Sequence, residues 1–367
     1  MKKIKIVHVQ VTPKLSGVQQ VSLDILKGLC DDYYDKYIIC GKLDKNSKQF
    51  VYEFEKANVH IIEVEEMLRD IGFKDVRLFF KLYSLFREYK FDIVHTNSTK
   101  PGVVARIAAR LSGVKKVIHT VHGISFHRNI TPIKRFFYFF IEYFSCLFGH
   151  VNVVVNKHYL KYYPLLNNKV IYNGVDFSGF SINKKESNDL IVAFMARLDE
   201  QKNPLLFIEA INELFKIDLD LSKVKFVIAG DGDLRTDCQE LIEKYDLSSS
   251  VEMKGWIYNK SEFLSSVDII CQPSNWEAFG LIFVESAYFN IPAIGSDVEG
   301  IPEVIDDGLT GFIFPSGDVI QLRNKIKYLI VDEKLREELG KNAYKRCLDN
   351  FEVNIMLKKY IEIYEKV

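Results

Sequence analysis

Short apolar segments alternate with longer amphipathic segments along most of this 367-residue chain. The first apolar segment, residues 4–9, precedes a loop and then a helical pattern from Gly17 to about residue 29. Alternation of this kind predicts parallel strands joined by helices. Residues 77–89 have helical apolar spacing, and the other predicted strands of this first series are residues 37–40, 59–62, 92–96, 116–120 and 151–155.

A second series of the same kind follows a polar stretch at residues 183–189, with predicted strands at 190–194, 225–229, 251–253, 269–271, 293–295 and 311–314. The two series predict an α/β protein with two Rossmann-like, doubly wound domains that face a cleft. We place these domains at residues 1–165 and 166–349, and an amphipathic pattern at 350–367 predicts a terminal helix. Ligands of such sheets bind beyond the carboxyl ends of the strands.

Charge is unevenly distributed along the chain although its net charge is zero. Residues 1–165 hold 26 basic and 15 acidic side chains, whereas the rest of the chain holds 23 basic and 34 acidic ones. A basic amino-terminal half favours an anionic partner, such as a phosphate group, a membrane surface or a nucleic acid.

The cysteines and the apolar runs narrow the class of protein further. The six cysteines include no C-x-x-C pair, which disfavours a zinc site or a disulfide framework and favours reduced thiols in a cytosolic protein. The longest apolar stretch, residues 136–148, is shorter than the about 20 residues that a membrane-spanning helix needs. The first residues lack the pattern of a signal peptide. We therefore expect a cytoplasmic protein.

The segment from Glu277 to Glu285 carries the most specific chemistry. A turn at Phe279-Gly280-Leu281 precedes an apolar helix, and the exposed N–H groups of a helix start favour an anion such as a diphosphate. Glu277 stands before the turn, where its carboxylate can accept hydrogen bonds from sugar hydroxyls, and Glu285 can reach a ribose diol. This segment resembles the E-x7-E segment of glycosyltransferase family 4, a large group of retaining enzymes with the GT-B fold. The resemblance implies that the terminal helix crosses back to the first domain.

Two cations, Arg197 and Lys202, follow the predicted strand 190–194. Cations at that place can neutralise the charge that grows on a departing nucleoside diphosphate, and the family resemblance implies that they bind the donor diphosphate. Ala196 stands where many family members have glycine. A glycine turn at Gly230 also resembles the family, and glycine lets a ligand approach the backbone closely.

The run Asp231-Gly232-Asp233 has the spacing of an acidic D-x-D metal site. The resemblance implies that no metal is required, because Arg197 and Lys202 supply the positive charge, so we predict neither a metal nor another cofactor. Residues 251–256 align by position with the family segment that contacts the nucleobase, and we interpret Trp256 as a core residue.

The first domain supplies two further candidates. Gly17 opens the first helix after Ser16, which stands where the family has another glycine, so a backbone N–H there could contact the donor. Ser16 is also a good helix cap, and a structural role stays open. His122, after the predicted strand 116–120, resembles the family's histidine-glycine signature, which implies that it hydrogen-bonds the donor sugar. Asn173-Gly174 resembles the family's interdomain turn, which indicates a hinge.

A basic and aromatic segment begins at Lys134 and Arg135 and continues through five aromatic residues at 136–140. Further cations lie nearby in the sequence, namely Arg106, Arg110, Lys115, Lys116 and Arg128. This combination favours an anionic lipid surface, and family members often act on lipid-linked acceptors. The alternative is that the aromatics belong to the core and the cations face solvent. We expect no nucleic acid, because no nucleic-acid module is recognised.

These residues predict a retaining glycosyltransferase at the inner face of the cell membrane. Its donor is a nucleotide-sugar, with a UDP-sugar favoured, and its acceptor is a hydroxyl of a lipid-linked oligosaccharide or a surface polysaccharide. The predicted catalytic residues are Glu277, Arg197, Lys202 and His122. The predicted donor-binding residues are Gly17, Gly230, Phe279, Gly280, Leu281 and Glu285. Two alternatives stay open, a GT-B sugar-nucleotide epimerase and a non-catalytic sugar-nucleotide-binding protein.

Overall fold

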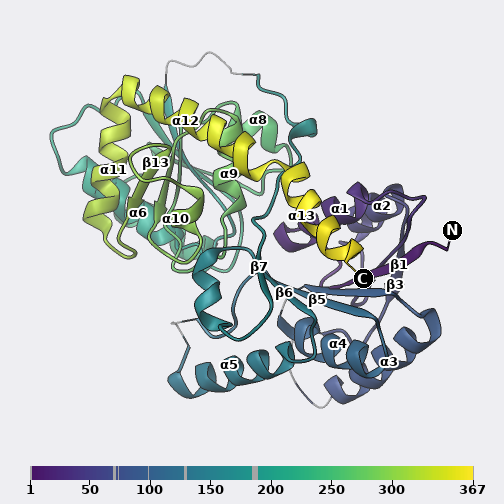
Figure 1. Cartoon of the computed structure of the whole chain (residues 1–367). Helices are drawn as coiled ribbons and strands as arrows, with labels where there is room; N and C mark the ends of the chain where they lie inside the picture. The colour runs from purple at the N-terminus through teal and green to yellow at the C-terminus, as the bar shows by residue number, and fades with distance from the viewer. Residues whose placement is uncertain are drawn as a thin grey trace. The chain divides into compact units, whose positions relative to one another are not determined.

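The computed structural model describes residues 2–68, 72, 74–97, 99–127, 130–183 and 189–366. The chain forms two compact units, one made of Met1–Gly174 with Val353–Val367 and the other of Val175–Glu352. Figure 1 draws the whole chain with its helices and strands labelled. Arg128, which we included among the cations near the aromatic segment, lies outside the described residues.

The described part of the first unit contains a seven-stranded parallel sheet in the order β3-β2-β1-β4-β5-β6-β7. Its strands are β1 (Ile4–Val9), β2 (Tyr34–Cys40), β3 (Val59–Glu63), β4 (Ile93–Asn97), β5 (Lys116–Val121), β6 (Val151–Val154) and β7 (Asn168–Val170). Its helices are α1 (Gly17–Gly28), α2 (Lys48–Lys56), α3 (Lys74–Tyr89), α4 (Thr99–Leu111), α5 (Pro132–Cys146) and α13 (Val353–Glu365).

Alternating side chains of these strands reach two hydrophobic cores, one on each face of the sheet. In β1, Ile6 belongs to the core under α1, α2 and α13, whereas Val7 belongs to the core under α3 and α4. Figure 1 shows these two groups of helices on opposite faces. The contact of α13 with α1 is close, because a Cβ added to Gly28 would overlap the Leu357 side chain.

The second unit has a six-stranded parallel sheet in its described part, in the order β10-β9-β8-β11-β12-β13. The strands are β8 (Leu190–Met195), β9 (Val224–Ala229), β10 (Val251–Gly255), β11 (Ile269–Gln272), β12 (Ala293–Ser296) and β13 (Gly311–Phe314). The helices are α6 (Pro204–Phe215), α7 (Arg235–Lys244), α8 (Lys260–Leu264), α9 (Leu281–Tyr288), α10 (Ile301–Val304), α11 (Val319–Val331) and α12 (Glu333–Phe351).

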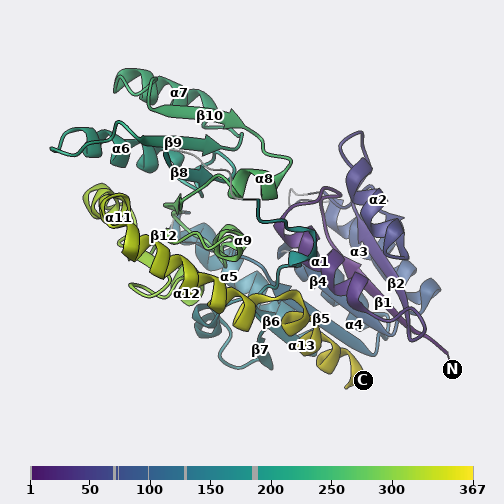
Figure 2. The same cartoon turned by 90° about the horizontal axis from the view of Figure 1, so that it is seen from above.

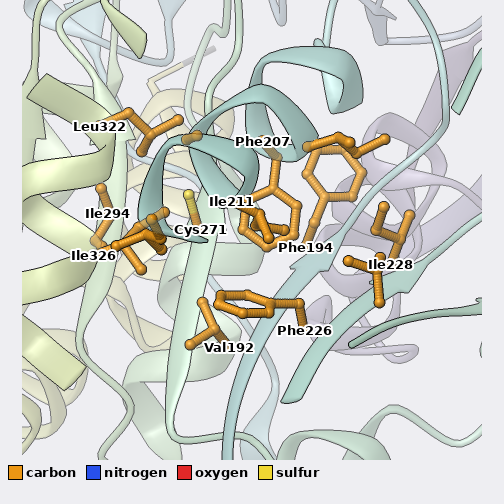
Figure 3. Close-up of a cluster of buried hydrophobic side chains, with 14 of the residues drawn as sticks. Val192, Phe194, Phe207, Ile211, Phe226, Ile228, Cys271, Ile294, Leu322 and Ile326 are labelled. Carbon is orange, nitrogen blue, oxygen red and sulfur yellow. The ribbon is translucent and has the colours of Figure 1, made fainter. Parts of the chain in front are cut away.

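The core of the second unit lies between its sheet and the helices α6, α7, α11 and α12. Figure 2 shows α6 and α7 beside the strands β8, β9 and β10. Figure 3 shows how Phe194, Phe207 and Phe226 fill the space between α6 and the strands. All three are fully buried, and each buried phenylalanine contributes roughly 1.5–3 kcal/mol to folding.

Local sequence signals define the start of α6, which follows the loop after β8. Asn203 is the N-cap, and its side-chain oxygen accepts a hydrogen bond from the Leu206 N–H. Pro204 occupies the first turn, where its fixed φ suits the helix and its missing N–H costs nothing. This start places residues 196–203 in a short loop at the carboxyl end of β8.

The structure confirms the predicted α/β class and both doubly wound sheets. In each sheet the strand order reverses beside the first strand, between β1 and β4 and between β8 and β11, which creates a switch point. None of the described helices is long and apolar enough to cross a bilayer.

Two predicted boundaries differ from the structure. The first unit ends at Gly174 rather than at residue 165, because β7 pairs with β6 and extends the first sheet. The terminal segment 350–367 is not one helix. The α12 helix ends at Phe351, Glu352 is extended with φ −68° and ψ 141°, and α13 begins at Val353. Glu352 forms a β-bridge with Val175 there.

Candidate functional site

The most concentrated group of predicted residues lies at the switch point of the second unit. The strands β8 and β11 are neighbours, and Val192 pairs with Ile269. Lys202 lies in the loop after β8, and Glu277 lies in the loop after β11. The Lys202 ammonium group donates a hydrogen bond to Glu277 Oε2. The Lys202 side chain is only 16% exposed and that of Glu277 11%, so this ion pair is largely shielded from water.

Hydrogen bonds fasten these two loops to each other. The Asn275 backbone N–H donates to the Gln201 carbonyl oxygen at 2.8 Å, and its side-chain amide donates to the Glu200 carbonyl oxygen at 2.7 Å. Gln201 in turn donates to the Trp276 carbonyl oxygen at 3.1 Å. These bonds join the residues directly before Lys202 to the residues directly before Glu277. They therefore fix the backbone on each side of the ion pair.

Arg197 lies in the same loop as Lys202 but is more exposed. Its side chain is 58% exposed, and Nη1 lies 2.7 Å from Asp199 Oδ2. Its Nη2 donates to Gln201 Oε1 at 3.1 Å. Gln201 thus connects the Arg197 guanidinium to the loop that carries Glu277. A guanidinium in this position can bind a phosphate group in a bidentate manner.

The turn before α9 has the backbone conformation that the sequence predicts. Gly280 is the N-cap of α9 with φ 83°, a left-handed conformation that favours glycine. Phe279 is buried, and its ring contacts that of Phe351 with centroids 5.5 Å apart. Leu281 is the first residue of α9, so the free N–H groups of the helix start follow this turn.

Glu285 lies one turn into α9, where it is 8% exposed. The sequence interpretation did not identify its partner, Lys260, whose ammonium nitrogen lies 2.6 Å from Glu285 Oε1. A single lysine in a polar segment carries no signal of this contact. Each of the two predicted carboxylates therefore has its own lysine, and the structure does not bring Glu277 and Glu285 into contact with each other.

Gly230 occupies a position that only glycine fits. Its φ is +151°, and a Cβ added there would overlap the Ala196 carbonyl oxygen. Its N–H donates to the Gly255 carbonyl oxygen at 2.7 Å. The loops after β8 and β9 therefore touch through their backbones, and Ala196 fills the place of the family's glycine without disturbing this contact.

Asp231 and Asp233, which have the spacing of a metal site, lie in the loop after β9. Asp231 accepts a hydrogen bond from the Gly232 N–H at 2.9 Å and lies 3.9 Å from Arg235. Within the described residues, no group of three or more His, Cys, Asp and Glu residues could hold a metal ion.

The prediction that Trp256 is a core residue is wrong. It is 52% exposed, because it follows the last residue of β10 and projects from the loop there.

Gly17 and His122 belong to the first unit, whereas the other eight predicted site residues belong to the second. Gly17 is the first residue of α1, and the Ser16 hydroxyl donates to Gln19 Oε1 at 2.5 Å instead of capping the helix. His122 lies directly after β5, with Nε2 3.1 Å from Asn97 Oδ1 at the end of β4. Burial and the nearby His119 lower the pKa of His122 to about 3, so this imidazole is neutral at physiological pH.

A hydrogen-bonded network lies deeper in the first unit and joins α13 to the middle of the sheet. His95 Nδ1 lies 2.6 Å from the Tyr364 hydroxyl, and its Nε2 lies 2.7 Å from the Thr120 hydroxyl. His8 Nε2 lies 3.2 Å from the same Tyr364 hydroxyl, and Thr120 also contacts the Tyr360 hydroxyl at 3.0 Å. All five residues are buried. Burial lowers the pKa of His8 to about 3.

The aromatic segment at residues 136–140 forms part of α5. One side of α5 is fixed to the unit, since Glu142, Ser145 and Cys146 are buried. The core alternative is wrong for most of the other side, because these apolar residues are 43–73% exposed: Ile133, Phe136, Phe137, Phe140, Ile141, Phe144 and Leu147.

Two of the cations near this segment in the sequence do not face solvent. Arg106 is fully buried and donates to the Ser145 hydroxyl at 2.7 Å and to Cys146 Sγ at 2.9 Å. Lys116 is 7% exposed and donates to the Ile363 carbonyl oxygen in α13. Neither adds charge to the surface. Arg106 instead joins α4 to α5, and Lys116 of β5 holds α13 against the sheet.

Known proteins with the same architecture identify the fold. HepE from Anabaena, solved in complex with UDP and glucose, has a TM-score of 0.83 at 18% identity, covering 99% of this chain and 100% of that one. Sucrose-phosphate synthase from Thermosynechococcus elongatus has a TM-score of 0.85 at 18% identity, covering 99% of each chain. These likenesses, together with the two doubly wound sheets, define the GT-B fold.

Sequence comparisons give the family. The model named Glycosyltransferase Family 4 matches residues 15–178, and the model for glycosyl transferases group 1 matches residues 178–346. An Escherichia coli relative, UDP-Gal:alpha-D-GlcNAc-diphosphoundecaprenol alpha-1,3-galactosyltransferase, is 32% identical over 99% of this chain and 97% of its own length. The chain belongs to glycosyltransferase family 4, and it is a glycosyltransferase, as the E-x7-E segment predicts.

A second relative, from Campylobacter jejuni, is 27% identical over 99% of each chain. It is a GalNAc-alpha-(1->4)-GalNAc-alpha-(1->3)-diNAcBac-PP-undecaprenol alpha-1,4-N-acetyl-D-galactosaminyltransferase. Both relatives match the chain from end to end, so the likeness extends to both units.

Proposed function

We propose that the chain transfers a galactose or N-acetylhexosamine residue from a UDP-sugar to a hydroxyl of a lipid-linked oligosaccharide, with retention of anomeric configuration. The names of the two relatives support this donor and acceptor class. The observation that carries the proposal is the shielded Lys202–Glu277 pair at the β8–β11 switch point. Both matching family models are transferase models, which disfavours the epimerase and the non-catalytic alternatives.

In this proposal, each charged group of the second unit binds a different part of the donor. Arg197 and Lys202 neutralise the diphosphate as the bond from the anomeric carbon to the phosphate oxygen breaks. The N–H groups at the start of α9 add to this stabilisation. Glu277 binds sugar hydroxyls and Glu285 binds the ribose diol, displacing Lys260. Because these cations supply the charge, we propose that no metal is required.

The proposed transfer proceeds on one face of the sugar. The acceptor oxygen bonds to the anomeric carbon on the face from which the phosphate departs, and the hydroxyl proton passes to the departing phosphate oxygen. His122 of the first unit, held by Asn97, binds a hydroxyl of the donor sugar as a neutral imidazole, and the Gly17 N–H contacts the donor. Neutrality matters here because a charged imidazolium would oppose the positive charge that develops at the anomeric carbon.

A thermal-shift screen over UDP-, GDP-, ADP- and TDP-sugars tests the donor class. A ligand that binds only the folded state raises Tm by mass action. At about 100 times its Kd, the correct UDP-sugar should raise Tm by about 5 °C or more. Glu285→Gln should remove most of this shift, whereas Glu240→Gln, at an exposed site on α7, should retain it. A shift with GDP-sugars alone would refute the UDP assignment.

We further propose that the exposed face of α5 binds the anionic inner surface of the cell membrane. The rings of Phe136, Phe140 and Phe144 follow one another along the helix, with neighbouring centroids 6.4 and 6.5 Å apart. Lys134 and Arg135 lie in the first turn of α5, directly before Phe136. Apolar residues with adjacent cations match the chemistry of an anionic bilayer surface, where a lipid-linked acceptor would be found.

Vesicle flotation tests this surface. Lys134→Gln with Arg135→Gln should weaken binding to vesicles that contain phosphatidylglycerol by about 30-fold, since each cation near such a surface contributes about 1 kcal/mol. Phe136→Ser with Phe140→Ser should weaken binding as well, without unfolding the exposed helix face. Tyr328→Ser, at an equally exposed aromatic on α11, is the matched control. Unchanged flotation of both double variants would exclude α5 as the membrane surface.

A further inference from the structure

Gln272 is a buried polar residue beside the proposed sugar-binding carboxylate that the mechanism above does not use. It is the last residue of β11 and is 1% exposed. Its Nε2 donates to Glu277 Oε2 at 3.2 Å and to the Ser274 hydroxyl at 2.9 Å. The Ser274 carbonyl oxygen in turn accepts a hydrogen bond from the Ser296 hydroxyl of β12 at 2.5 Å. The Gln272 amide is therefore bonded to the loop after β11, and Ser296 of β12 fastens that loop to the sheet.

The carboxylate determines which way the Gln272 amide faces. An ionised carboxylate only accepts hydrogen bonds, so the amide nitrogen, and not the amide oxygen, must face Glu277. In this orientation Gln272 Oε1 is buried and finds no donor among the residues that the structure describes. Buried polar atoms are rarely left unpaired, so an unpaired one needs a physical explanation. The amide thus places its nitrogen on Glu277 and leaves its own oxygen without a hydrogen bond.

Lys202 and Gln272 act on the same oxygen of Glu277. Both donate to Oε2, and neither of these two bonds involves Oε1. The ammonium group of a lysine is a point charge on a flexible stem, so it fixes the charge of its partner better than the direction. The amide of a buried residue at a strand end has a fixed direction, and it restricts the rotation of the carboxylate.

We propose that Gln272 is a positioning residue that, together with Lys202, clamps Glu277 Oε2 and so presents Oε1 to the hydroxyl groups of the donor sugar. This inference rests on the proposed function, because it takes Glu277 as the sugar-binding carboxylate. Gln272 is itself buried and does not touch the donor. Its loss should therefore weaken recognition of the donor sugar and leave the binding of the nucleotide intact.

The test compares Gln272→Met, which keeps the length of the side chain but has no donor, with Gln239→Met, the same change at an exposed residue of α7 whose amide also donates to a glutamate. UDP, UDP-galactose and UDP-N-acetylgalactosamine are the probes, with Kd measured by calorimetry and kcat by release of UDP. Gln272→Met should keep the Kd of UDP within about 2-fold and lower kcat by about 10- to 100-fold, as misplaced catalytic groups do. Its preference for the UDP-sugar over UDP should disappear. Gln239→Met should stay within about 3-fold of the wild type in each of these quantities, as surface substitutions usually do.

Wild-type kcat in Gln272→Met would overturn the inference, and so would an equal loss of affinity for UDP and for the UDP-sugar. If Gln272→Met does not fold, Gln272→Asn takes its place, since it retains a buried amide but withdraws it from Glu277 by one methylene. The same loss of kcat with unchanged UDP affinity supports the inference, and full activity refutes it. A wild-type chain that binds none of the three probes refutes the proposed function, and this inference with it.

Discussion

Lys202→Ala is expected to lower kcat for donor turnover by about 10²- to 10³-fold, which is the usual effect of removing one preorganised group that stabilises developing charge. The change removes the cation that the proposal places at the diphosphate, and it also removes the ionic partner of Glu277. Arg197→Ala combined with Lys202→Ala should abolish measurable transfer, because the leaving group then keeps only the backbone N–H groups at the start of α9. Initial rates of UDP release measure both effects.

The matched control for Lys202 is Lys216→Ala. Lys216 is also a lysine of the second unit in an ion pair, with Glu213 at 2.6 Å, but its side chain is 57% exposed. An exposed pair of this kind contributes about 0–1 kcal/mol to stability, and it lies at the end of α6 rather than at the switch point. Its loss should leave kcat unchanged. Melting curves of both variants separate a loss of activity from a loss of folding, and full activity in folded Lys202→Ala would contradict the proposed role.

The sequence predicted the sheets well because each buried parallel strand is a short apolar run between polar loops. The exceptions follow from the same physics. The strand β7 was missed because its three residues, Asn168–Val170, include a single apolar side chain. The break at Glu352 was missed because no proline or glycine marks it, and a backbone bridge to Val175 determines it instead.

The site was predictable where the chemistry lies within one segment. The segment from Glu277 to Glu285 combines two carboxylates with a glycine turn, and this pattern is local. Lys260 and Gln272 could not be found in this way, because each acts through a contact that only the fold creates. The burial of Arg106 was unpredictable for the same reason, since its partner Ser145 lies on another helix.

The buried histidines of the first unit should make its stability strongly dependent on pH. Burial lowers the pKa of His8 from 6.5 to about 3, and it also lowers the pKa of His95 and His119 well below 6.5. Between pH 3 and 6.5 the unfolded chain therefore binds more protons than the folded chain. The stability that the neutral histidines contribute is fully present above pH 6.5 and is lost as pH falls. For His8 alone the loss at pH 5 is about 2 kcal/mol, a large part of a net stability of about 5–15 kcal/mol.

Glu142 opposes this trend, because burial raises its pKa from 4.5 to about 7. Its contribution is fully present below pH 4.5 and is lost as pH rises through 7, so acidification favours the folded state at this residue. A comparison between variants removes this term, since Glu142 is present in each of them. His8→Gln therefore isolates the histidine effect from the total pH dependence of the unit.

Hydrogen exchange of the β1 and β4 amides at pH 7.5 and pH 5 measures the effect in the first unit itself. Between these two pH values, the wild type should lose about 2 kcal/mol more opening free energy than His8→Gln. His60→Gln is the control, because His60 lies on β3 with a side chain that is 66% exposed, and it should lose as much as the wild type. If His8→Gln lost as much stability as the wild type, His8 would not contribute to the acid sensitivity, and its imidazolium form would already be accommodated in the folded unit.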